Sequence, residues 1–312
     1  MPELPEVETI ARGLAKRVTG DVVESVWLGE KKDLLKSPAT EIAATLEHSR
    51  IADIRRMGKH IVFDLEQDRV GRAPLPAKGR GADGKSKKSA LTAAQASSTP
   101  QTEAGKSARP TQASAQWIVH LGMTGRLQLC EPQTEVEKHT HAILKLSSGR
   151  ELRFVDPRRF GRLSVAAAAG FEAGGIEPLE IDLVRFVALF RGRKTPIKSA
   201  LLNQKLLRGV GNIYADESLF RSAIRPRRRA ATLTREQLAK LLTAIQEVLK
   251  EAIALGGSSI SDYVDADGEA GFFQLQHRVY ARESEPCLVC KTPIKRIVIA
   301  GRSSHYCPKC QK

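Results

Sequence analysis

Four of the five cysteines in this 312-residue chain are concentrated in its last 26 residues. Cys287 and Cys290 form one Cys-x2-Cys pair, Cys307 and Cys310 form a second, and sixteen residues separate the pairs. Two such pairs at this spacing are typical of a tetrahedral Zn²⁺ site. A redox pair is the alternative, but that chemistry needs only one Cys-x2-Cys. Because four thiolates close the coordination sphere, the sequence predicts one structural zinc ion that holds a hairpin together.

The remaining cysteine, Cys130, makes the total odd, which argues against a disulfide framework and favours a reducing compartment. The longest apolar or small stretch, residues 163–171, has nine residues, whereas a membrane span needs about 20. The N-terminal MPELPEVETI also lacks the hydrophobic region of a secretion signal. We therefore expect a cytoplasmic protein that does not bind membranes.

The charge of the chain favours a polyanionic partner. Fifty Lys and Arg residues against 35 Asp and Glu residues leave a net charge of +15. Such an excess attracts nucleic acid far more readily than a neutral metabolite. Nucleic acid is therefore the leading candidate partner.

The N-terminal part has the pattern of a mostly β domain that begins with a helix. Val7, Ile10, Leu14 and Val18 recur at helical spacing after Pro5. A second helix is expected around residues 41–47. Between and after them, short β-type runs occupy residues 22–27, 61–65, 117–121, 127–130, 142–146 and 152–155. Six such runs favour a sandwich or a barrel over alternating βαβ units.

An insertion interrupts this β pattern at residues 67–115. It consists of small, polar and basic residues with no aromatic residue. Such a segment buries too little apolar surface to offset the entropy of ordering, so we expect a disordered, basic surface loop. Its KSKK stretch either touches phosphates nonspecifically or is simply solvated.

The C-terminal part is predicted to be helical. Apolar residues cluster from Ile181 onward, and Thr234 with Gln237 forms a capping box ahead of a long apolar stripe. The turn and proline residues of GGIEPL, 174–179, mark a linker. These patterns divide the chain into residues 1–176, a helical domain at 181–275 and a zinc hairpin at 280–312.

Two segments have the composition of a nucleic-acid site. RGVGNIYADESLF, residues 208–220, resembles a helix-two-turns-helix whose glycines allow a phosphate to reach a helix N-terminus. An ordinary helix connection would show the same glycines. Loop tips at HLGMTG, 120–125, and DPRRFG, 156–161, carry Met123 and Phe160, which suit insertion between bases, although such residues more often pack in a core.

The N-terminus itself carries candidate catalytic groups. Removal of Met1 would leave Pro2 as a secondary amine with a pKa of about 8, so an appreciable neutral, nucleophilic fraction exists at pH 7. Such an amine forms an iminium with a sugar carbon, and Glu3 or Glu6 can move protons beside it. The alternative is a plain helix start, where proline and acidic residues are common.

Five motifs in the same order resemble the bacterial formamidopyrimidine-DNA glycosylase family. They are PELPEVET, HLGMTG, DPRRFGR, GVGNIYADESLF and the terminal cysteine pairs. The resemblance covers nearly the whole chain except residues 67–115. It implies an α+β, multidomain fold with an N-terminal β-sandwich with flanking helices, a helix-two-turns-helix domain and a zinc-finger hairpin. It also implies excision of oxidised purines from duplex DNA, followed by strand cleavage through β,δ-elimination.

The resemblance further implies a role for each matching residue. Pro2 would be the nucleophile, Glu3 the proton donor and acceptor, and Glu6 a supporting carboxylate. Lys59 would assist elimination or hold the lesion phosphate, and Arg302 of the zinc hairpin would grip phosphates, although spacing alone fits a solvated arginine equally well. An attached Met1 would make the Pro2 nitrogen an unreactive amide, so processing is essential.

The DNA-contacting residues follow in the same way. Met123, Arg158 and Phe160 would fill the gap left by the everted base, with Arg158 facing the orphaned cytosine. His120, His139, Arg193 and Asn212 would contact phosphates or sugar, and residues 257–274 would cover the base. The implied protein is a monomer that binds damaged double-stranded DNA in the nucleoid. Alternatives are an endonuclease VIII-like glycosylase for oxidised pyrimidines and a non-catalytic DNA-binding homologue.

Overall fold

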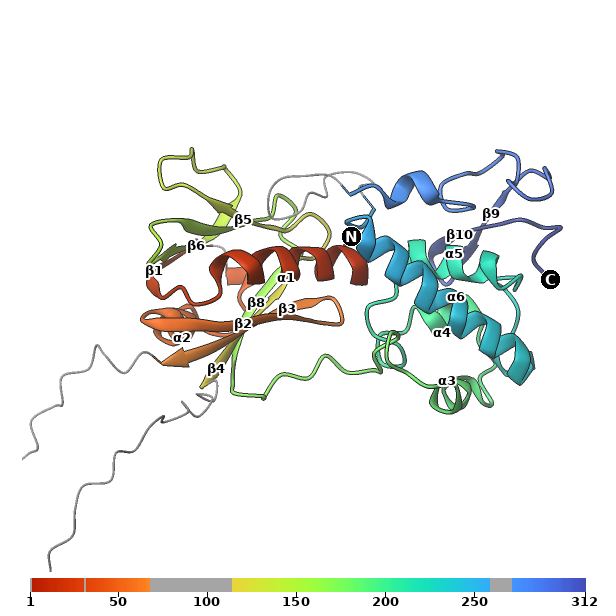
Figure 1. Ribbon diagram of the computed structural model, residues 1–312, viewed down its shortest axis with the longest axis horizontal. Coiled ribbons are helices and arrows are strands. Elements are labelled where there is room, and N and C mark those ends of the chain that lie inside the picture. Colours follow the sequence, from red (N-terminus) through yellow and green to blue (C-terminus); the bar gives the residue numbers. More distant parts are fainter. Residues whose placement is uncertain (1, 31, 68–113, 259–270) are drawn as a thin grey trace, which may run out of the picture.

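The computed structural model describes residues 2–30, 32–67, 114–258 and 271–312. The strands of the N-terminal part and the helices of the C-terminal part lie at opposite ends of the molecule, and helix α1 (Leu4–Val18) runs from one end toward the other (Figure 1). This is the predicted mixture of helix and strand. The predicted insertion, residues 67–115, lies almost wholly outside the described residues.

Helix α1 forms where the apolar repeat predicts it. Val7, Ile10, Leu14 and Val18 are all buried, and they face the sheets because residues three and four apart share one side of a helix. The helix packs on two neighbouring strands, β2 (Ser49–Met57) and β3 (His60–Gln67). Its polar side carries Glu8 and Arg12, which form an ion pair one turn apart.

The N-terminal half is a sandwich of two four-stranded antiparallel sheets. One has the order β1 (Val23–Leu28), β6 (Thr140–Leu146), β7 (Glu151–Val155), β5 (Arg126–Cys130). The other has the order β2, β3, β4 (Ala115–His120), β8 (Arg162–Ala167). Side chains from both sheets, including Phe63, Trp117 and Phe154, share one core, and α2 (Ala39–Leu46) packs against strands of both. A short 3₁₀ turn, η1 (Lys32–Leu34), precedes α2.

Six strands were expected in this half, and its described residues form eight. The strands that the pattern did not predict are β2 and β8. In β2 the charged residues Asp53, Arg55 and Arg56 interrupt the alternation, yet they are tolerated because Asp64 pairs with Arg55 and Glu8 pairs with Arg56. The sequence of β8 is rich in small residues and lacks a strand-like pattern. This strand forms through its pairing with β4.

The helical half has its own core. It contains α3 (Leu183–Phe190), α4 (Ile197–Leu201), α5 (Asn212–Arg221), η2 (Ala230–Thr232) and α6 (Arg235–Ala254). The predicted capping box starts α6: the Gln237 N–H donates to Thr234 Oγ1, and the Thr234 N–H donates to Gln237 Oε1. Gly256 and Gly257 both have positive φ and end the helix.

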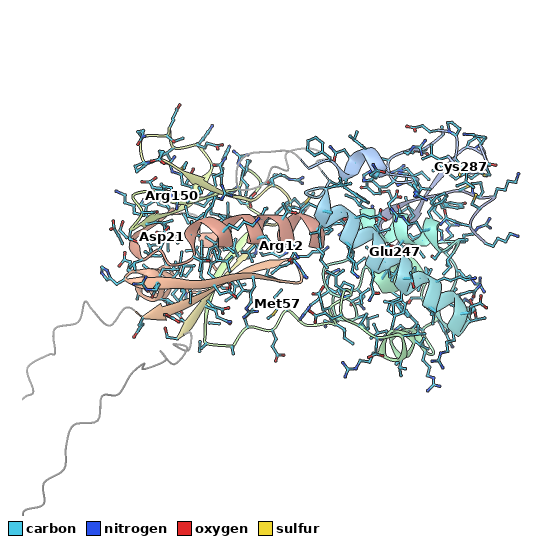
Figure 2. All side chains as sticks on the ribbon, viewed as in Figure 1. Arg12, Asp21, Met57, Arg150, Glu247 and Cys287 are labelled. Atoms are coloured by element: carbon cyan, nitrogen blue, oxygen red, sulfur yellow. The ribbon has the colours of Figure 1, made fainter. Side chains whose placement is uncertain are left out.

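The last segment is a small unit that is held against α5 by hydrogen bonds. Strands β9 (Lys295–Ile299) and β10 (Arg302–Tyr306) form a hairpin, preceded by the 3₁₀ turn η3 (Phe273–Gln276). Buried Glu217 on α5 accepts the backbone N–H groups of residues 278–280 and so fixes the path into the hairpin. Figure 2 places Cys287 at the end of the molecule opposite Asp21 and Arg150.

Leu4 is one of the residues that join the two halves. Leu4 begins α1, but its fully buried side chain belongs to the core of the helical half. Its N–H donates to the carbonyl of Gly209 at 3.0 Å. Since Pro2 and Glu3 directly precede Leu4, this anchor holds the start of the chain at the junction between the halves.

Candidate active site

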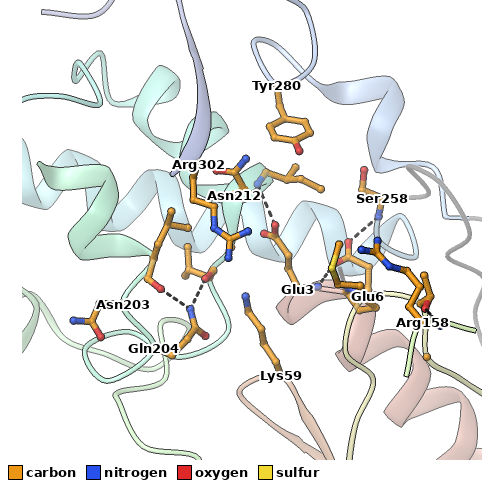
Figure 3. A pocket seen from close by; sticks show the side chains of 18 of the residues that line it. Glu3, Glu6, Lys59, Arg158, Asn203, Gln204, Asn212, Ser258, Tyr280 and Arg302 are labelled. Carbon is orange, nitrogen blue, oxygen red and sulfur yellow. Dashed lines mark hydrogen bonds between the residues drawn. The ribbon is translucent and has the colours of Figure 1, made fainter. Parts of the chain in front are cut away.

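A cavity of about 560 Å³ lies at this junction. Its walls come from the start of α1, the β2–β3 turn, the 120–125 and 156–161 loop tips, the segment around α5 and the zinc hairpin (Figure 3). The predicted site residues that line it are Pro2, Glu3, Glu6, Lys59, Met123, Arg158, Asn212 and Arg302. The fold therefore brings together all five of the predicted catalytic residues.

The surroundings of Glu3 raise the pKa of its carboxyl group. Its side chain is buried beside the N-terminus of α5, and the Ile213 N–H donates to its Oε1 at 3.1 Å. Its Oε2 is buried and has no hydrogen bond within the described part of the chain. Burial raises the pKa of Glu3 to about 7, although nearby Lys59 acts in the opposite direction. Glu3 can therefore gain or lose a proton near neutral pH.

Glu6 connects three parts of the site. Its carboxylate accepts the Glu3 N–H at 2.7 Å, the Ser258 N–H at 2.8 Å and the Tyr214 hydroxyl. Burial raises its pKa, while these donors favour the ionised form. These contacts tie Glu6 to the backbone at Glu3 and Ser258 and to the side chain of Tyr214.

Lys59 reaches the cavity from the β2–β3 turn. Gly58 has a φ of 62°, which the tight turn between the strands requires. The Lys59 side chain is nine-tenths buried and points toward the space between Glu3 and Arg302 (Figure 3). Burial lowers the pKa of Lys59, and Arg302 acts in the same direction, whereas Glu3 and Glu6 raise it. An amine whose pKa is lowered in this way can transfer a proton during catalysis.

Cationic and polar groups line the opposite wall. Arg302 is the first residue of β10, directly after the Ala300–Gly301 turn, where both residues have positive φ. Asn212 at the start of α5 donates to Ser303 Oγ at 3.3 Å, which ties α5 to the hairpin. Tyr280 also lines the cavity. Tyr280 was not predicted, because no local pattern marks it. Contacts distant in the chain bring it to this wall, among them the hydrogen bonds of Glu217 to residues 278–280 and the contact of the Tyr280 ring with His305.

Two glycines allow backbone to approach the carboxylates closely. A Cβ at Gly211 would lie 2.2 to 2.5 Å from atoms of the Glu3 carboxylate. A Cβ at Gly257 would lie 2.9 Å from Cγ of Glu6. Neither distance is possible in a relaxed structure, so glycine at these positions leaves room for the carboxylates of Glu3 and Glu6.

The two loop tips form one unit. Buried Asp156 accepts the Thr124 hydroxyl at 2.6 Å and the Gly161 N–H at 2.7 Å, which fixes one tip against the other. Met123 and Phe160 are 42% and 46% exposed, so core packing, the alternative for both, is wrong. The Arg158 guanidinium lies 5.0 Å from the centre of the Phe160 ring.

The other predicted DNA contacts lie outside the cavity lining. The side chain of His120 is half-buried at the end of β4, 4.9 Å from the His60 ring, and its Nδ1 accepts the Gly122 N–H. Burial lowers the pKa of His120 to about 4. His139 and Arg193 are exposed, and Phe160 is not among the lining residues either.

A hydrogen bond closes the base of the segment predicted to cover the everted base. Ser258 Oγ lies 3.1 Å from His277 Nε2, and both groups are buried. The Ser258 backbone also forms an antiparallel bridge with Phe272. Most of the predicted covering segment, residues 259–270, lies outside the described residues. The Ser258–His277 pair joins its two flanks, and no local pattern in the sequence predicted this contact.

The four cysteines fit a zinc ion. Their Sγ atoms all lie within 4.8 Å of one another, with Cys287 and Cys310 at 3.9 Å and Cys290 and Cys307 at 3.4 Å. A regular tetrahedron with Zn–S bonds of 2.3 Å places sulfurs about 3.8 Å apart. The residues can therefore hold one structural zinc ion, as predicted.

Comparison with known proteins agrees with this geometry. Three family models match in order: the formamidopyrimidine-DNA glycosylase N-terminal domain over residues 1–163, its H2TH domain over 175–264 and the zinc finger found in FPG and IleRS over 284–312. The chain belongs to the formamidopyrimidine-DNA glycosylase family. The family prediction made from the five motifs is thus confirmed, as is the mixed fold.

Full-length relatives and solved structures support the same assignment. The formamidopyrimidine-DNA glycosylases of Solibacter usitatus and Gluconobacter oxydans are 42% and 37% identical, each covering 100% of both chains. The crystal structure of MutM (Fpg) from Thermus thermophilus has a TM-score of 0.77 at 36% identity, covering 99% of this chain and 98% of that one. Lactococcus lactis Fpg in complex with DNA containing an abasic site has a TM-score of 0.80 at 29% identity, covering 99% of each chain.

Among the described residues, none of the helices has the length and apolar character needed to cross a membrane.

Proposed function

We propose that this protein is a base-excision-repair glycosylase and abasic-site lyase that removes oxidised purines, 8-oxoguanine and formamidopyrimidines, from duplex DNA. One observation carries the proposal: the start of the chain, a carboxyl group with a pKa near 7 and a buried lysine share one cavity. The Lactococcus lactis relative has been solved with Fapy-dG containing DNA, which supports the same substrate class.

The first step joins the protein to the sugar. After removal of Met1, the neutral Pro2 nitrogen donates its lone pair to C1′ of the damaged nucleotide, and the glycosidic C–N bond breaks. The bonding pair leaves with the base, which takes the N–H proton of Pro2. The C1′–O4′ bond then opens as the nitrogen forms an iminium, and O4′ accepts a proton from Glu3. The unpaired Oε2 of Glu3 suits this transfer, because the Ile213 N–H occupies Oε1.

The second step cuts the strand. Ionised Glu3 can now take a proton from C2′, and the C3′–O bond breaks with its electron pair on the departing phosphate. Loss of a C4′ proton and cleavage of the C5′–O bond complete the δ-elimination, and water hydrolyses the iminium to free Pro2. Lys59 is proposed to assist the proton transfers, and Arg302 to stabilise phosphate charge.

The loop tips are proposed to stabilise the opened duplex. Eversion of a base costs a few kcal/mol of unstacking, and exposed apolar side chains can refill the gap. Met123 and Phe160 fit this role because both are exposed beside the cavity. The Arg158 guanidinium can donate to the acceptor edge of the orphaned cytosine, which favours cytosine as the opposite base. Asn212, His120 and His139 are proposed to contact the DNA backbone.

The alternatives from the sequence receive less support. The full-length relatives carry the formamidopyrimidine-DNA glycosylase name, not that of an endonuclease VIII-like enzyme. A non-catalytic binder would have no use for a carboxyl group held near neutral pKa in the DNA-facing cavity.

The proposal also covers the domain organisation of the chain and the location of the protein in the cell. We infer domains at residues 1–176, 181–275 and 280–312, supported by three separate hydrophobic cores. We also infer a monomer that works in the cytoplasm and associates with the nucleoid through DNA.

Borohydride trapping tests the proposal. Borohydride reduces the iminium, so wild-type protein should form a covalent adduct on an 8-oxoguanine:cytosine duplex, and Pro2→Gly should form much less. Tight binding without an adduct would instead favour a non-catalytic binder. Stronger trapping on thymine glycol than on 8-oxoguanine would favour an enzyme for oxidised pyrimidines.

A further inference from the structure

The side chain of Gln204 ties together the two ends of the connection between α4 and α5. Its Nε2 donates to the carbonyl of Leu202 at 2.9 Å, directly after α4, and to the carbonyl of Val210 at 2.8 Å, two residues before α5. Its Oε1 accepts the Gly209 N–H at 2.9 Å. Figure 3 shows the two bonds from Nε2 as dashed lines. One amide group therefore sets how the end of α4 lies relative to the start of α5.

The amide group of Gln204 has little capacity left for a ligand. A glutamine side chain offers two N–H donors and one carbonyl acceptor. Both donors bind backbone carbonyls, and the oxygen accepts a backbone N–H. The reverse orientation would place the amide oxygen against two carbonyl oxygens, so these three contacts fix the amide. Although Gln204 lines the lesion cavity, its polar atoms bind the backbone of the protein itself.

The segment that Gln204 holds also contacts the start of the chain. We call residues 209–211 the glycine turn. The Gly209 carbonyl accepts the Leu4 N–H at 3.0 Å, and a Cβ at position 209 would lie 2.8 Å from Cδ1 of Leu4. Just beyond the turn, the Ile213 N–H donates to Glu3 Oε1 at 3.1 Å. The same short segment thus fixes both the backbone next to Glu3 and the Glu3 carboxyl group.

Small movements of the glycine turn would change the environment of Glu3. The Glu3 carboxylate already occupies the space that a side chain on Gly211 would need. The ionisable groups that face Glu3 are Lys59, Glu6, Lys198 and Tyr280. Burial is the main cause of the raised pKa of Glu3, so a turn that opened would admit water and let the carboxyl group ionise at lower pH. Gln204 carries no charge, and it therefore affects this pKa through the position of the turn.

We propose that Gln204 is a positioning residue for base excision: its amide holds the glycine turn against the N-terminus and thereby places the Glu3 carboxyl group for proton transfer. The inference rests on the proposed function, since it takes Glu3 as the proton donor. Gln204 acts through the backbone and does not need to touch the substrate. Loss of its three hydrogen bonds should impair the chemical step more than DNA binding.

A methionine substitution tests the proposal. Q204M keeps an unbranched side chain of similar length and removes all three hydrogen bonds. The matched control is Q246M on α6. Gln246 is also half-buried, and its Nε2 likewise donates to two backbone carbonyls, those of Pro178 and Ile181, but it does not line the cavity.

The expected result is a loss of rate in the Gln204 variant and not in the control. Displacement of a catalytic group by about 1 Å costs up to roughly 100-fold, so Q204M should slow single-turnover excision of 8-oxoguanine on the order of 10- to 100-fold. Q246M should keep the wild-type rate. Affinity for a duplex with a tetrahydrofuran abasic analogue, which requires no proton transfer, should change far less than the rate. Circular dichroism checks that the variants fold.

The pH profile separates positioning from a general structural defect. In wild type, the ionisation of Glu3 should produce a limb near pH 7, and the absence of this limb in Glu3→Gln identifies it. In Q204M the limb should move toward 4.5, the ordinary pKa of the group, because water reaches the carboxyl group. Lower global stability alone would not change the ionisation of Glu3 in the folded molecules.

A second variant covers the case in which Q204M does not fold. Q204E keeps an acceptor for the Gly209 N–H, but its carboxylate cannot donate to the carbonyls of Leu202 and Val210. We therefore expect Q204E to lose excision rate as well. A wild-type rate in Q204E would show that these two bonds do not position Glu3.

Three further results would overturn the proposal. They are a wild-type rate and limb in Q204M, equal losses in Q204M and Q246M, and weaker binding of the analogue with an unchanged rate and limb. The last of these would make Gln204 a DNA contact. Borohydride trapping by wild-type protein on a lesion duplex is measured in parallel. Its absence refutes the proposed function, whereas its presence with an unchanged rate and limb in Q204M refutes only the role of Gln204.

Discussion

At the scale of single residues, the burial of Glu3 has a measurable consequence for catalysis. Its carboxyl group lies beside the free N–H groups at the start of α5, and burial raises its pKa to about 7. An amide in its place keeps the shape but cannot transfer a proton. We expect Glu3→Gln to reduce base excision in single-turnover assays by about 10²- to 10⁴-fold, the usual contribution of general acid–base catalysis. Undiminished excision would contradict this role.

The same pKa predicts how stability changes with pH. Because the folded pKa of Glu3 lies above its unfolded value of 4.5, the unfolded chain ionises first as pH rises. Glu3 therefore contributes full stability below about pH 4.5, and this contribution disappears as the pH approaches 7. Glu3→Gln should match wild type near pH 4.5 and melt several degrees higher at pH 8. Thermal melts across this range test the sign, and a constant difference would contradict the assigned pKa.

At the scale of elements, the approach of α5 to α1 depends on Gly211. A Cβ there would overlap the Glu3 carboxylate, although the backbone itself is compatible with alanine. We expect Gly211→Ala to reduce excision on the order of 100-fold, the typical result of displacing a catalytic group by about 1 Å. Gly29→Ala is the matched control, since its new Cβ would come no closer than 3.4 Å to any neighbour. Equal activity of the two variants would refute the close approach.

The Ser258–His277 hydrogen bond should affect base removal more than strand cleavage. It joins the flanks of the segment proposed to cover an everted base, and an abasic site has no base to cover. We expect Ser258→Ala or His277→Leu to slow excision about 2- to 10-fold, the value of one hydrogen bond, and to leave cleavage of a preformed abasic site unchanged. His277→Gln should restore excision because its amide can reach the same position. Equal losses in both reactions would indicate a general folding defect.

The sequence predicted some elements and not others for physical reasons. Local spacing determines helix α1, the α6 capping box and the cysteine pairs, so the sequence pattern was enough to predict them. Strand β2 depends on ion pairs with α1 and β3 that no local pattern contains. Tyr280 and His277 reach the site through contacts with residues distant in the chain, among them Glu217 and Ser258. Arg193, which was predicted to contact DNA, is exposed and lies outside the cavity lining, so its contact with DNA stays a prediction.

At the scale of the whole molecule, the site exists only because three units meet. Leu4 inserts the start of α1 into the helical core, the β2–β3 turn brings Lys59, and the zinc hairpin brings Arg302. The proposed catalytic residues thus come from positions 2 to 302 of the chain. Their assembly depends on long-range packing, which explains why motif resemblance identified them while periodicity alone could not.

Removal of the zinc should therefore disable DNA binding without unfolding the sheets. The hairpin that carries Arg302 has only a small core, of which Cys287 and Cys307 are members. Four-thiolate sites of this kind contribute folding energy directly, so Cys310→Ser or a strong chelator should release the metal and sharply weaken affinity for a lesion duplex. Metal analysis and binding assays check this, with circular dichroism as the control for the sandwich. Full affinity in metal-free protein would contradict the structural role.

The most direct test of the account is the site of the covalent bond. Wild-type protein is trapped with borohydride on an 8-oxoguanine:cytosine duplex, digested, and mapped by mass spectrometry. The proposed mechanism predicts that Met1 is absent and that the deoxyribose remnant is attached to the Pro2 nitrogen. An adduct on Lys59, or a reactive protein that retains Met1, would contradict it.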